Sequence, residues 1–142
     1  PYTGGGYMHT TDDRTPVTFI TRYYLDKIKR LCDAHGTKLL FVTAPSPVNH
    51  TMQRHNEVQA LADALAVPYL DLNLNTEELG IDWNLDTLDG GDHLNYTGCQ
   101  KATAYLQRYM QTHYTLPDRR DDVRYEAWNK QAEEFEKLLP QP

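Results

Sequence analysis

Two short apolar runs, separated by one helical segment, constrain the fold of this chain most. The run 38–44 is almost continuously apolar, which is typical of a strand covered on both faces of a parallel sheet. The run 67–72 forms a second strand, and the residues 52–66 between them place Val58, Leu61 and Ala62 on one helix face. A strand, a helix and a strand at this spacing predict a βαβ unit with parallel strands and a right-handed crossover.

Local start and stop signals predict two further helices around this unit. The first begins with Thr15 as N-cap and Pro16 in its first turn, and it ends at Gly36. The second begins at Tyr96 or Thr97, after Asn95 as N-cap.

A last amphipathic helix is expected over about 122–139. Trp128, Phe135, Leu138 and Leu139 form one stripe of it, and Glu and Lys residues lie between them. We expect the stripe to pack and the charged residues to face water.

The chain is long enough for one domain of the α/β class. We expect an arm or loop over 1–14, an α/β domain over 15–116 and an amphipathic C-terminal helix over 117–142 that packs on it. Two strands make a marginal sheet, so the arm, a second chain or other sequence is expected to complete it. The chain opens on a proline rather than a methionine, so we expect a processed form and leave preceding sequence open.

Composition excludes several function classes. The formal net charge of −6 argues against a general nucleic-acid binder, which needs clustered Lys and Arg. No apolar run in the sequence approaches the length of a membrane span, and we expect no signal peptide in it. The two cysteines, Cys32 and Cys99, lie at apolar helical positions, which favours buried small side chains over a disulfide framework or a zinc site.

The segment 89–98 (DGGDHLNYTG) carries the strongest chemical signal. It sets His93 beside Asp89 and Asp92 on a glycine-hinged turn that opens into a helix. Reactive groups collect at the carboxyl ends of parallel strands, where this turn is expected to meet the loops 45–50 and 71–75. There a histidine acts as general base and acid, and an adjacent carboxylate orients its ring. A helix cap or a surface ion pair is the alternative explanation.

The order of these blocks resembles the C-terminal half of an SGNH/GDSL hydrolase. The resemblance covers about 15–110: a strand ending in Pro-Ser-Pro, a helix, a strand ending in Asp-Leu-Asn, and then Asp-x-x-Asp-His-Leu-Asn-x-x-Gly. It is closest to the Gram-positive envelope branch, which includes relatives of the D-alanyl transfer protein and O-acetyl esterases. The segment 116–120, with Tyr125 and Trp128, is also similar to tails of that branch.

The resemblance implies a three-layer α/β/α fold, flavodoxin-like, with a short parallel sheet. It implies a serine esterase or acyltransferase that acts on an acylated glycan or similar ester, outside the cell or at its envelope, without a cofactor. His93 matches the catalytic histidine. The family's aspartate usually stands three residues earlier, where this chain has Gly90, so Asp89 and Asp92 are both candidates.

The nucleophile of this family lies in an N-terminal Gly-Asp-Ser block that the sequence lacks. Its single serine, Ser46, stands between two prolines, and Pro47 has no N–H to contribute to an oxyanion hole. We therefore expect Ser46 to be a turn residue and this chain by itself to be inactive. The candidate substrate-binding residues are Ser46, Asn49, Asn95 and Tyr96.

Several alternatives stay open at this stage. The turn could bind a divalent ion with His9 or His50, but metal-ligand spacing is lacking, and we expect no metal site. Tyr7, Tyr96 and Trp83 could form a sugar-stacking surface, whereas His35, His55 and His113 are expected at the surface. The competing functions are a non-catalytic module that binds carbohydrate or protein, and a site completed by oligomerisation or by a missing N-terminal segment.

Overall fold

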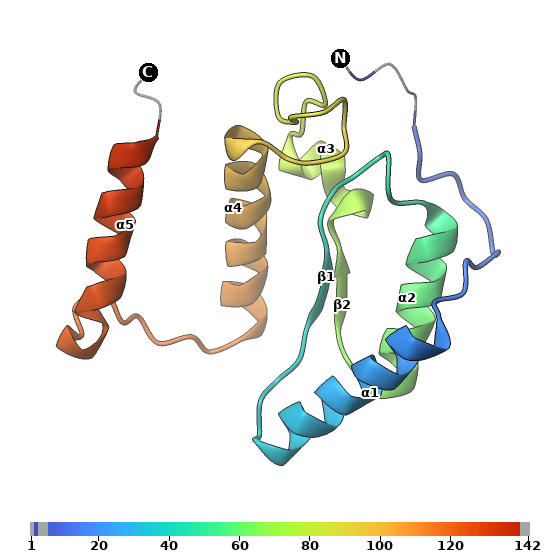
Figure 1. Ribbon diagram of the computed structural model, residues 1–142, viewed down its shortest axis with the longest axis horizontal. Coiled ribbons are helices and arrows are strands. Elements are labelled where there is room, and N and C mark those ends of the chain that lie inside the picture. Colours follow the sequence, from blue (N-terminus) through green and yellow to red (C-terminus); the bar gives the residue numbers. More distant parts are fainter. Residues whose placement is uncertain (1, 3–5, 140–142) are drawn as a thin grey trace. The chain divides into compact units, whose positions relative to one another are not determined.

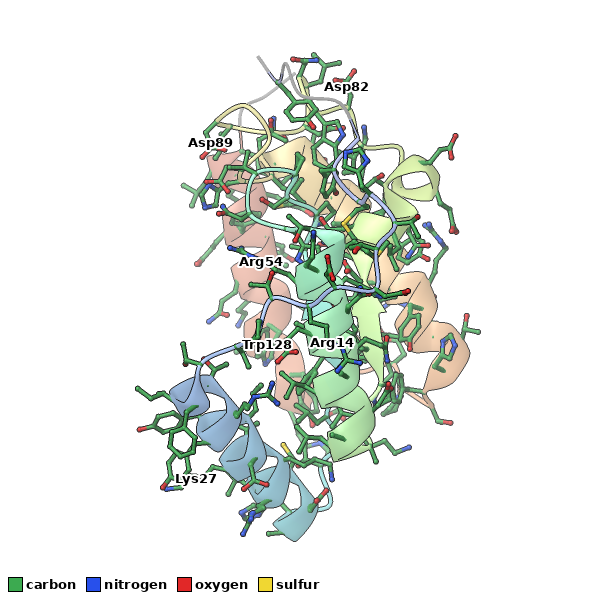
Figure 2. The ribbon with its side chains drawn as sticks, turned by 90° about the vertical axis from the view of Figure 1, so that its right-hand side faces the viewer. Arg14, Lys27, Arg54, Asp82, Asp89 and Trp128 are labelled. Carbon is green, nitrogen blue, oxygen red and sulfur yellow. The ribbon has the colours of Figure 1, made fainter. Side chains whose placement is uncertain are left out.

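The computed structural model describes residues 2 and 6–139, and it divides the chain into two compact units, Pro1–Leu106 and Gln107–Pro142. Figure 1 shows the elements in chain order, and Figure 2 adds their side chains. The boundary between the units falls inside a helix, earlier than the predicted domain end at residue 116. Each unit is described by itself. In the part of the chain that the structure describes, no helix is both long enough and apolar enough to cross a membrane.

The centre of the first unit is the predicted βαβ arrangement. Strand β1 (Phe41–Thr43) and strand β2 (Tyr69–Asp71) pair in parallel, with Phe41 opposite Tyr69 and Thr43 opposite Asp71. Helix α2 (Met52–Leu65) connects them (Figure 1). The parallel pairing and the α/β class are confirmed, although both strands are shorter than the apolar runs that predicted them.

Helix α2 is defined by its own end residues. The side chain of Thr51 accepts a hydrogen bond from the backbone N–H of Arg54, as an N-cap does, and Ala66 ends the helix in the left-handed conformation. The buried side of α2 contacts strand β2. The buried apolar residues of the described chain are Leu61, Ala62, Val67, Leu70, Leu72 and Leu79.

Helix α1 (Phe19–Ala34) begins later than predicted. Thr18, not Thr15, is its N-cap, because the Thr18 hydroxyl accepts from the N–H of Thr21. The N–H of Thr15 instead donates to the carbonyl of Gln53, which holds the preceding segment against α2. The predicted end is confirmed, since Gly36 follows the helix with φ +63°.

The apolar side of α1 is open, and so is one face of β1. Phe19 is 80% exposed and Leu31 61% exposed, and α1 has no buried residue. Val42 of β1 is 42% exposed, so the prediction that this strand is covered on both faces is wrong. Within the described residues the sheet is covered less than the apolar run implied.

The N-terminal arm does not extend the sheet. Its described residues form no strand, and they are held by side chains of other segments instead. The Asn56 amide on α2 donates to the carbonyls of Thr11 and Asp13, at 2.7 and 2.9 Å. The predicted loop over 1–14 is therefore an arm laid on α2, apart from residues 1 and 3–5, which lie outside the described residues.

After β2 the chain forms two short helical turns, η1 (Leu72–Asn75) and α3 (Thr76–Leu79), and then a long loop before helix α4 (Tyr96–His113). The predicted N-cap of α4 is confirmed, because the Asn95 side chain accepts from the N–H of Gly98. The cysteine of this helix, Cys99, is exposed, so its predicted burial is wrong, whereas Cys32 is half-buried.

The second unit continues α4 from Gln107 and ends in helix α5. A short 3₁₀ turn, η2 (Val123–Tyr125), precedes α5 (Glu126–Leu138), so the predicted helix over 122–139 is split at its start. The split follows from Asp122, whose carboxylate caps η2 by accepting from the N–H of Arg124. On α5, Trp128, Phe135 and Leu138 are exposed.

Candidate functional site

Three loops meet at the carboxyl ends of the two strands, as the sequence predicts. Asn73, after β2, accepts the N–H of Ser46, after β1, at 2.8 Å, and donates to the carbonyl of Ala44 at 3.0 Å. The Ser46 hydroxyl in turn lies 3.4 Å from an oxygen of Asp92, in the loop before α4. Asp89 lies at the end of the first unit that is opposite Lys27 of α1 (Figure 2).

The loop that carries His93 is a small hairpin. Thr87 and Leu94 form an antiparallel bridge, and the N–H of Leu88 donates to the carbonyl of His93 at 2.9 Å. The tip needs its two glycines, since Gly90 and Gly91 have φ of +70° and +105°, a region that side chains rarely adopt. The predicted fold-back at the glycine pair is therefore present.

Gly91 also sets how closely the hairpin approaches the Ser46 loop. A Cβ atom on Gly91 would stand 2.9 Å from Cγ of Pro47 and 3.0 Å from the ring of Tyr2. The absence of a side chain thus lets the hairpin backbone lie directly on both residues.

A buried ion pair anchors the base of this hairpin. Asp86 is 2% exposed, and its carboxylate accepts from the Lys101 ammonium at 2.5 Å and from the Thr97 hydroxyl at 2.8 Å. Burial acts to raise the pKa of Asp86, but the hydrogen bonds from Lys101, the N–H of Asp82 and Thr97 together outweigh it and keep this pKa below its ordinary value. The hairpin is thereby tied to the first turns of α4.

His93 is held at the surface by Asp89. Its Nδ1 lies 2.7 Å from Oδ2 of Asp89, and its backbone N–H donates to Oδ1 of the same carboxylate at 2.7 Å. The His93 side chain is 69% exposed, and no described residue hydrogen-bonds its Nε2. The bond to Asp89, with the nearby charge of Asp92, raises the pKa of His93, and the same bond lowers the pKa of Asp89.

Asp92 lies between the histidine and the serine. One of its oxygens is 3.5 Å from Nδ1 of His93, and the other accepts from the Asn49 amide and lies 3.4 Å from the Ser46 hydroxyl. Of the two candidate carboxylates, Asp89 makes the shorter contact with the ring.

Ser46 is positioned as a turn residue. Its hydroxyl oxygen accepts from the N–H of Asn49 at 3.1 Å, and its proton points to Asp92 rather than to His93. A serine nucleophile needs the histidine between it and the aspartate. Here the Asp92 carboxylate lies between Ser46 and His93, so the described geometry does not place the His93 ring where it could take the Ser46 proton.

The other candidate substrate-binding residues are engaged within the fold. The Asn95 amide caps α4 and donates to the carbonyl of Leu85 at 2.6 Å. The Tyr96 hydroxyl accepts from the side chain of Gln100 at 3.0 Å. Tyr96 does not line the cavity that contains Tyr7 and Trp83, so the predicted aromatic surface includes only two of its three residues.

A buried cluster at the end of β2 was not predicted from the sequence. Asp71 is 4% exposed, and one of its oxygens lies 2.8 Å from Nε2 of His50 and 2.8 Å from Nδ1 of His55. Burial acts to raise the pKa of Asp71, but hydrogen bonds from His50 and Asn73 overcome it and lower this pKa. The prediction that His55 lies at the surface is wrong. The spacing of His55 from His50 at the start of α2 was the available signal.

Among the residues that the structure describes, two groups have ligand atoms close enough to hold a cation. The first group is Asp89, Asp92 and His93, and the second is His50, His55 and Asp71. Neither combination includes His9, which lines another cavity, and His50 belongs to the second group rather than to the turn. In both groups each histidine already contacts a carboxylate through one ring nitrogen, and we assign no metal.

The chain matches no protein-family model, no curated protein and no solved structure.

Proposed function

We propose that Asp89 and His93 are the base half of an ester-hydrolase or acyltransferase site of the SGNH type, on a three-layer α/β/α fold. One observation supports the proposal above the others: Asp89 engages Nδ1 of an exposed His93 ring, and no described residue hydrogen-bonds Nε2. That arrangement fixes the tautomer in which Nε2 carries the lone pair.

The chemistry follows from this tautomer. Nε2 of His93 takes the proton of an attacking hydroxyl as its oxygen bonds to the ester carbonyl carbon. The imidazolium then gives that proton to the departing alcohol, which leaves an acyl-enzyme. In a second round water, or an acceptor hydroxyl, attacks the acyl group, and His93 again moves the proton. Asp89 keeps the ring oriented and stabilises its charged form throughout, consistent with the raised pKa of His93.

The nucleophile, we propose, is the serine of a Gly-Asp-Ser segment that lies outside this sequence. Ser46 is the chain's single serine, and its proton is directed to Asp92. The exposed Nε2 of His93 and the open face of β1 leave room for such a segment. By its resemblance the natural substrate is an acylated glycan at the cell envelope.

The test uses the polypeptide as its gene encodes it, with hydrolysis of an O-acetylated glycan as the readout. We expect His93→Ala to reduce kcat by about 10³-fold or more, because the base is lost. Asp89→Asn is expected to reduce kcat strongly as well, and Asp92→Asn to reduce it less.

His113→Ala is the matched control, because His113 is an exposed histidine whose ring contacts are to Tyr109 of its own helix, through the backbone carbonyl and by ring stacking. Its hydrolysis rate should equal that of the unmodified protein. Full activity in folded His93→Ala would overturn the proposal, and labelling of Ser46 by a fluorophosphonate would overturn the assignment of the nucleophile.

A further inference from the structure

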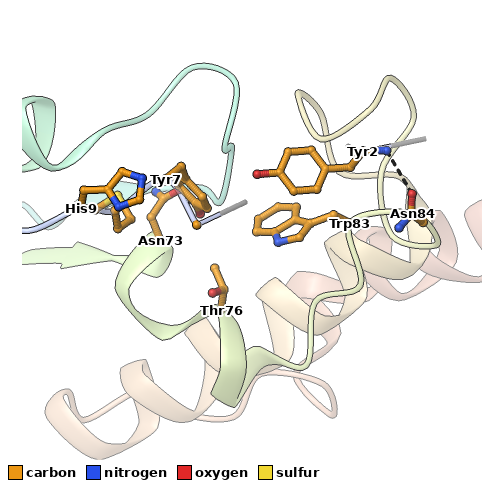
Figure 3. A pocket seen from close by; sticks show the side chains of 9 residues that line it. Tyr2, Tyr7, His9, Asn73, Thr76, Trp83 and Asn84 are labelled. Carbon is orange, nitrogen blue, oxygen red and sulfur yellow. Dashed lines mark hydrogen bonds between the residues drawn. The ribbon is translucent and has the colours of Figure 1, made fainter. Parts of the chain in front are cut away.

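A cavity of about 580 Å³ lies beside the His93 hairpin and is built from three separate segments. The arm contributes Tyr7 and His9, the turns after β2 contribute Asn73 and Thr76, and the loop before the hairpin contributes Trp83 and Asn84. Figure 3 shows Tyr7, His9 and Asn73 on one side, with Trp83, Tyr2 and Asn84 on the other. The proposed chemistry uses none of these side chains.

Trp83 is the apolar surface of this cavity. Its ring lies 5.7 Å from that of Tyr7, edge-on at 80°, and 5.9 Å from that of Tyr2, tilted by 52°. The Tyr7 hydroxyl donates to Asn73 at 2.8 Å, which fixes that ring in turn. These contacts support the indole at its edge, and no described aromatic ring stacks parallel to it, so its face is open to a ligand.

The same cavity holds polar groups that the fold does not use. Among the described residues, no hydrogen-bond partner exists for the Thr76 hydroxyl, the indole N–H of Trp83 or the amide N–H₂ of Asn84. The Asn84 carbonyl oxygen, by contrast, accepts from the N–H of Tyr2 at 3.0 Å (Figure 3). The indole N–H of Trp83, the amide N–H₂ of Asn84 and the hydroxyl of Thr76 are therefore available to a ligand that packs on the Trp83 ring.

Charge restricts what such a cavity accepts. Its lining includes no carboxylate, lysine or arginine, although the chain has a net charge of −6. A charged ligand would lose hydration there without gaining a counter-charge. A flat nucleobase binds best between two parallel aromatic rings, and the described lining of the cavity offers no such pair. A neutral ring with an apolar C–H face and several hydroxyl groups fits both the indole and the unused polar groups.

We propose that this cavity binds one neutral pyranose ring, packed on Trp83 and hydrogen-bonded by Thr76 and Asn84. The site is close to the hairpin, because the Tyr2 ring lies against Gly91, and Asn73 bonds both Tyr7 and the N–H of Ser46. The role of the cavity in positioning a sugar near His93 rests on the proposed function, whereas the binding of the sugar does not.

The experiment measures binding without any reaction. Trp83 and Trp128 are the two tryptophans of the chain, so Trp128→Phe leaves Trp83 as the single reporter of fluorescence. The probes are cellotetraose and chitotetraose as neutral saccharides, glucuronate as an anionic sugar, and adenosine as a flat base. We expect the Trp83 emission to change saturably with a neutral saccharide, with a dissociation constant of about 1 mM or lower.

Two variants in the Trp128→Phe background test the contacts. Thr76→Val and Asn84→Ala should each weaken saccharide binding by about fivefold to tenfold, because each loses one hydrogen bond of about 1 kcal/mol. Thr103→Val, at an exposed position of α4 outside the cavity lining, is the control and should leave binding unchanged.

The outcomes separate the two proposals. Saccharide binding without His93-dependent hydrolysis would leave the sugar site standing and overturn the proposed function. Hydrolysis with no saturable change for either neutral saccharide would overturn the sugar site alone. Tighter binding of adenosine or glucuronate than of the neutral sugars, or binding unaffected by both variants, would also overturn it.

Discussion

At the scale of single residues, two histidine–carboxylate contacts of nearly equal length have different consequences. His93 and Asp89 lie 2.7 Å apart at the surface, where the ring stays accessible to a substrate. His50 and Asp71 lie 2.8 Å apart in the interior, where the contact joins the start of α2 to the end of β2. Exposure, rather than hydrogen-bond length, makes the first pair a chemical candidate and the second a structural one.

The surface pair predicts a measurable titration. Because Asp89 stabilises the charged ring, the His93 resonances in NMR should titrate with a midpoint above 6.5, and Asp89→Asn should lower it. Asp92→Asn should lower it less. A raised folded-state pKa adds stability that is fully present below the unfolded pKa and is lost as pH rises through the folded pKa. An unchanged midpoint in Asp89→Asn would contradict the assigned hydrogen bond.

At the scale of elements, helix ends follow local chemistry while helix faces depend on neighbours. Asn95 caps α4 as predicted, and Thr51 caps α2 through the same kind of short-range hydrogen bond. The apolar face of α1, however, is exposed, although its periodicity is that of a buried helix. The pattern identifies which side of a helix is apolar, but a second element must be present to cover it.

The contact between α4 and the hairpin predicts a strong effect of one methyl group. A Cβ on Gly98 would overlap the carbonyl oxygen of Asp86. Gly98→Ala should therefore lower the free energy of unfolding by about 1–3 kcal/mol in urea titrations. Thr103→Ala, at an exposed position of the same helix, should change it by less than about 0.5 kcal/mol. Equal stabilities of the two variants would show that the hairpin does not pack on α4 as described.

The two apolar helix faces predict opposite results for the same substitution. Leu61→Ala removes a buried side chain of α2 and should cost about 2–4 kcal/mol of unfolding free energy. Leu31→Ala removes a 61% exposed side chain of α1 and should cost less than about 0.5 kcal/mol. A large loss of unfolding free energy in Leu31→Ala would mean that the apolar face of α1 is covered in solution. Self-association is one way to cover it, and light scattering would detect it.

At the scale of the whole molecule, the chain consists of two units, and only the first carries the candidate site. The six buried apolar residues of the described chain all belong to that unit, around α2 and β2. The proposed base half of a catalytic site is thus assembled on a small core, and the described residues place no nucleophile in line with it.

This arrangement predicts that the chain alone is not an esterase. Its hydrolysis of nitrophenyl acetate should stay at background and be the same in His93→Ala, because the Ser46 proton is directed to Asp92. A turnover that disappears in both His93→Ala and Ser46→Ala would contradict this prediction and make Ser46 the nucleophile.

The sequence by itself determined the features that depend on a few neighbouring residues. These are the βαβ order, the cap Asn95, the end of α1 at Gly36 and the glycine-hinged turn. Hydrogen bonds between residues three or four apart and the periodicity of apolar side chains are written into adjacent positions, so they can be read without knowing the fold.

Only the tertiary structure decided the features that join distant segments. Thr18 replaces Thr15 as N-cap because Thr15 is bonded to α2, and His55 is drawn inward by Asp71. Asp92 comes to lie between His93 and Ser46 because the hairpin packs on the loop after β1. Such contacts form only when packing brings together residues far apart in the chain, and their distances are not encoded in any short stretch of sequence.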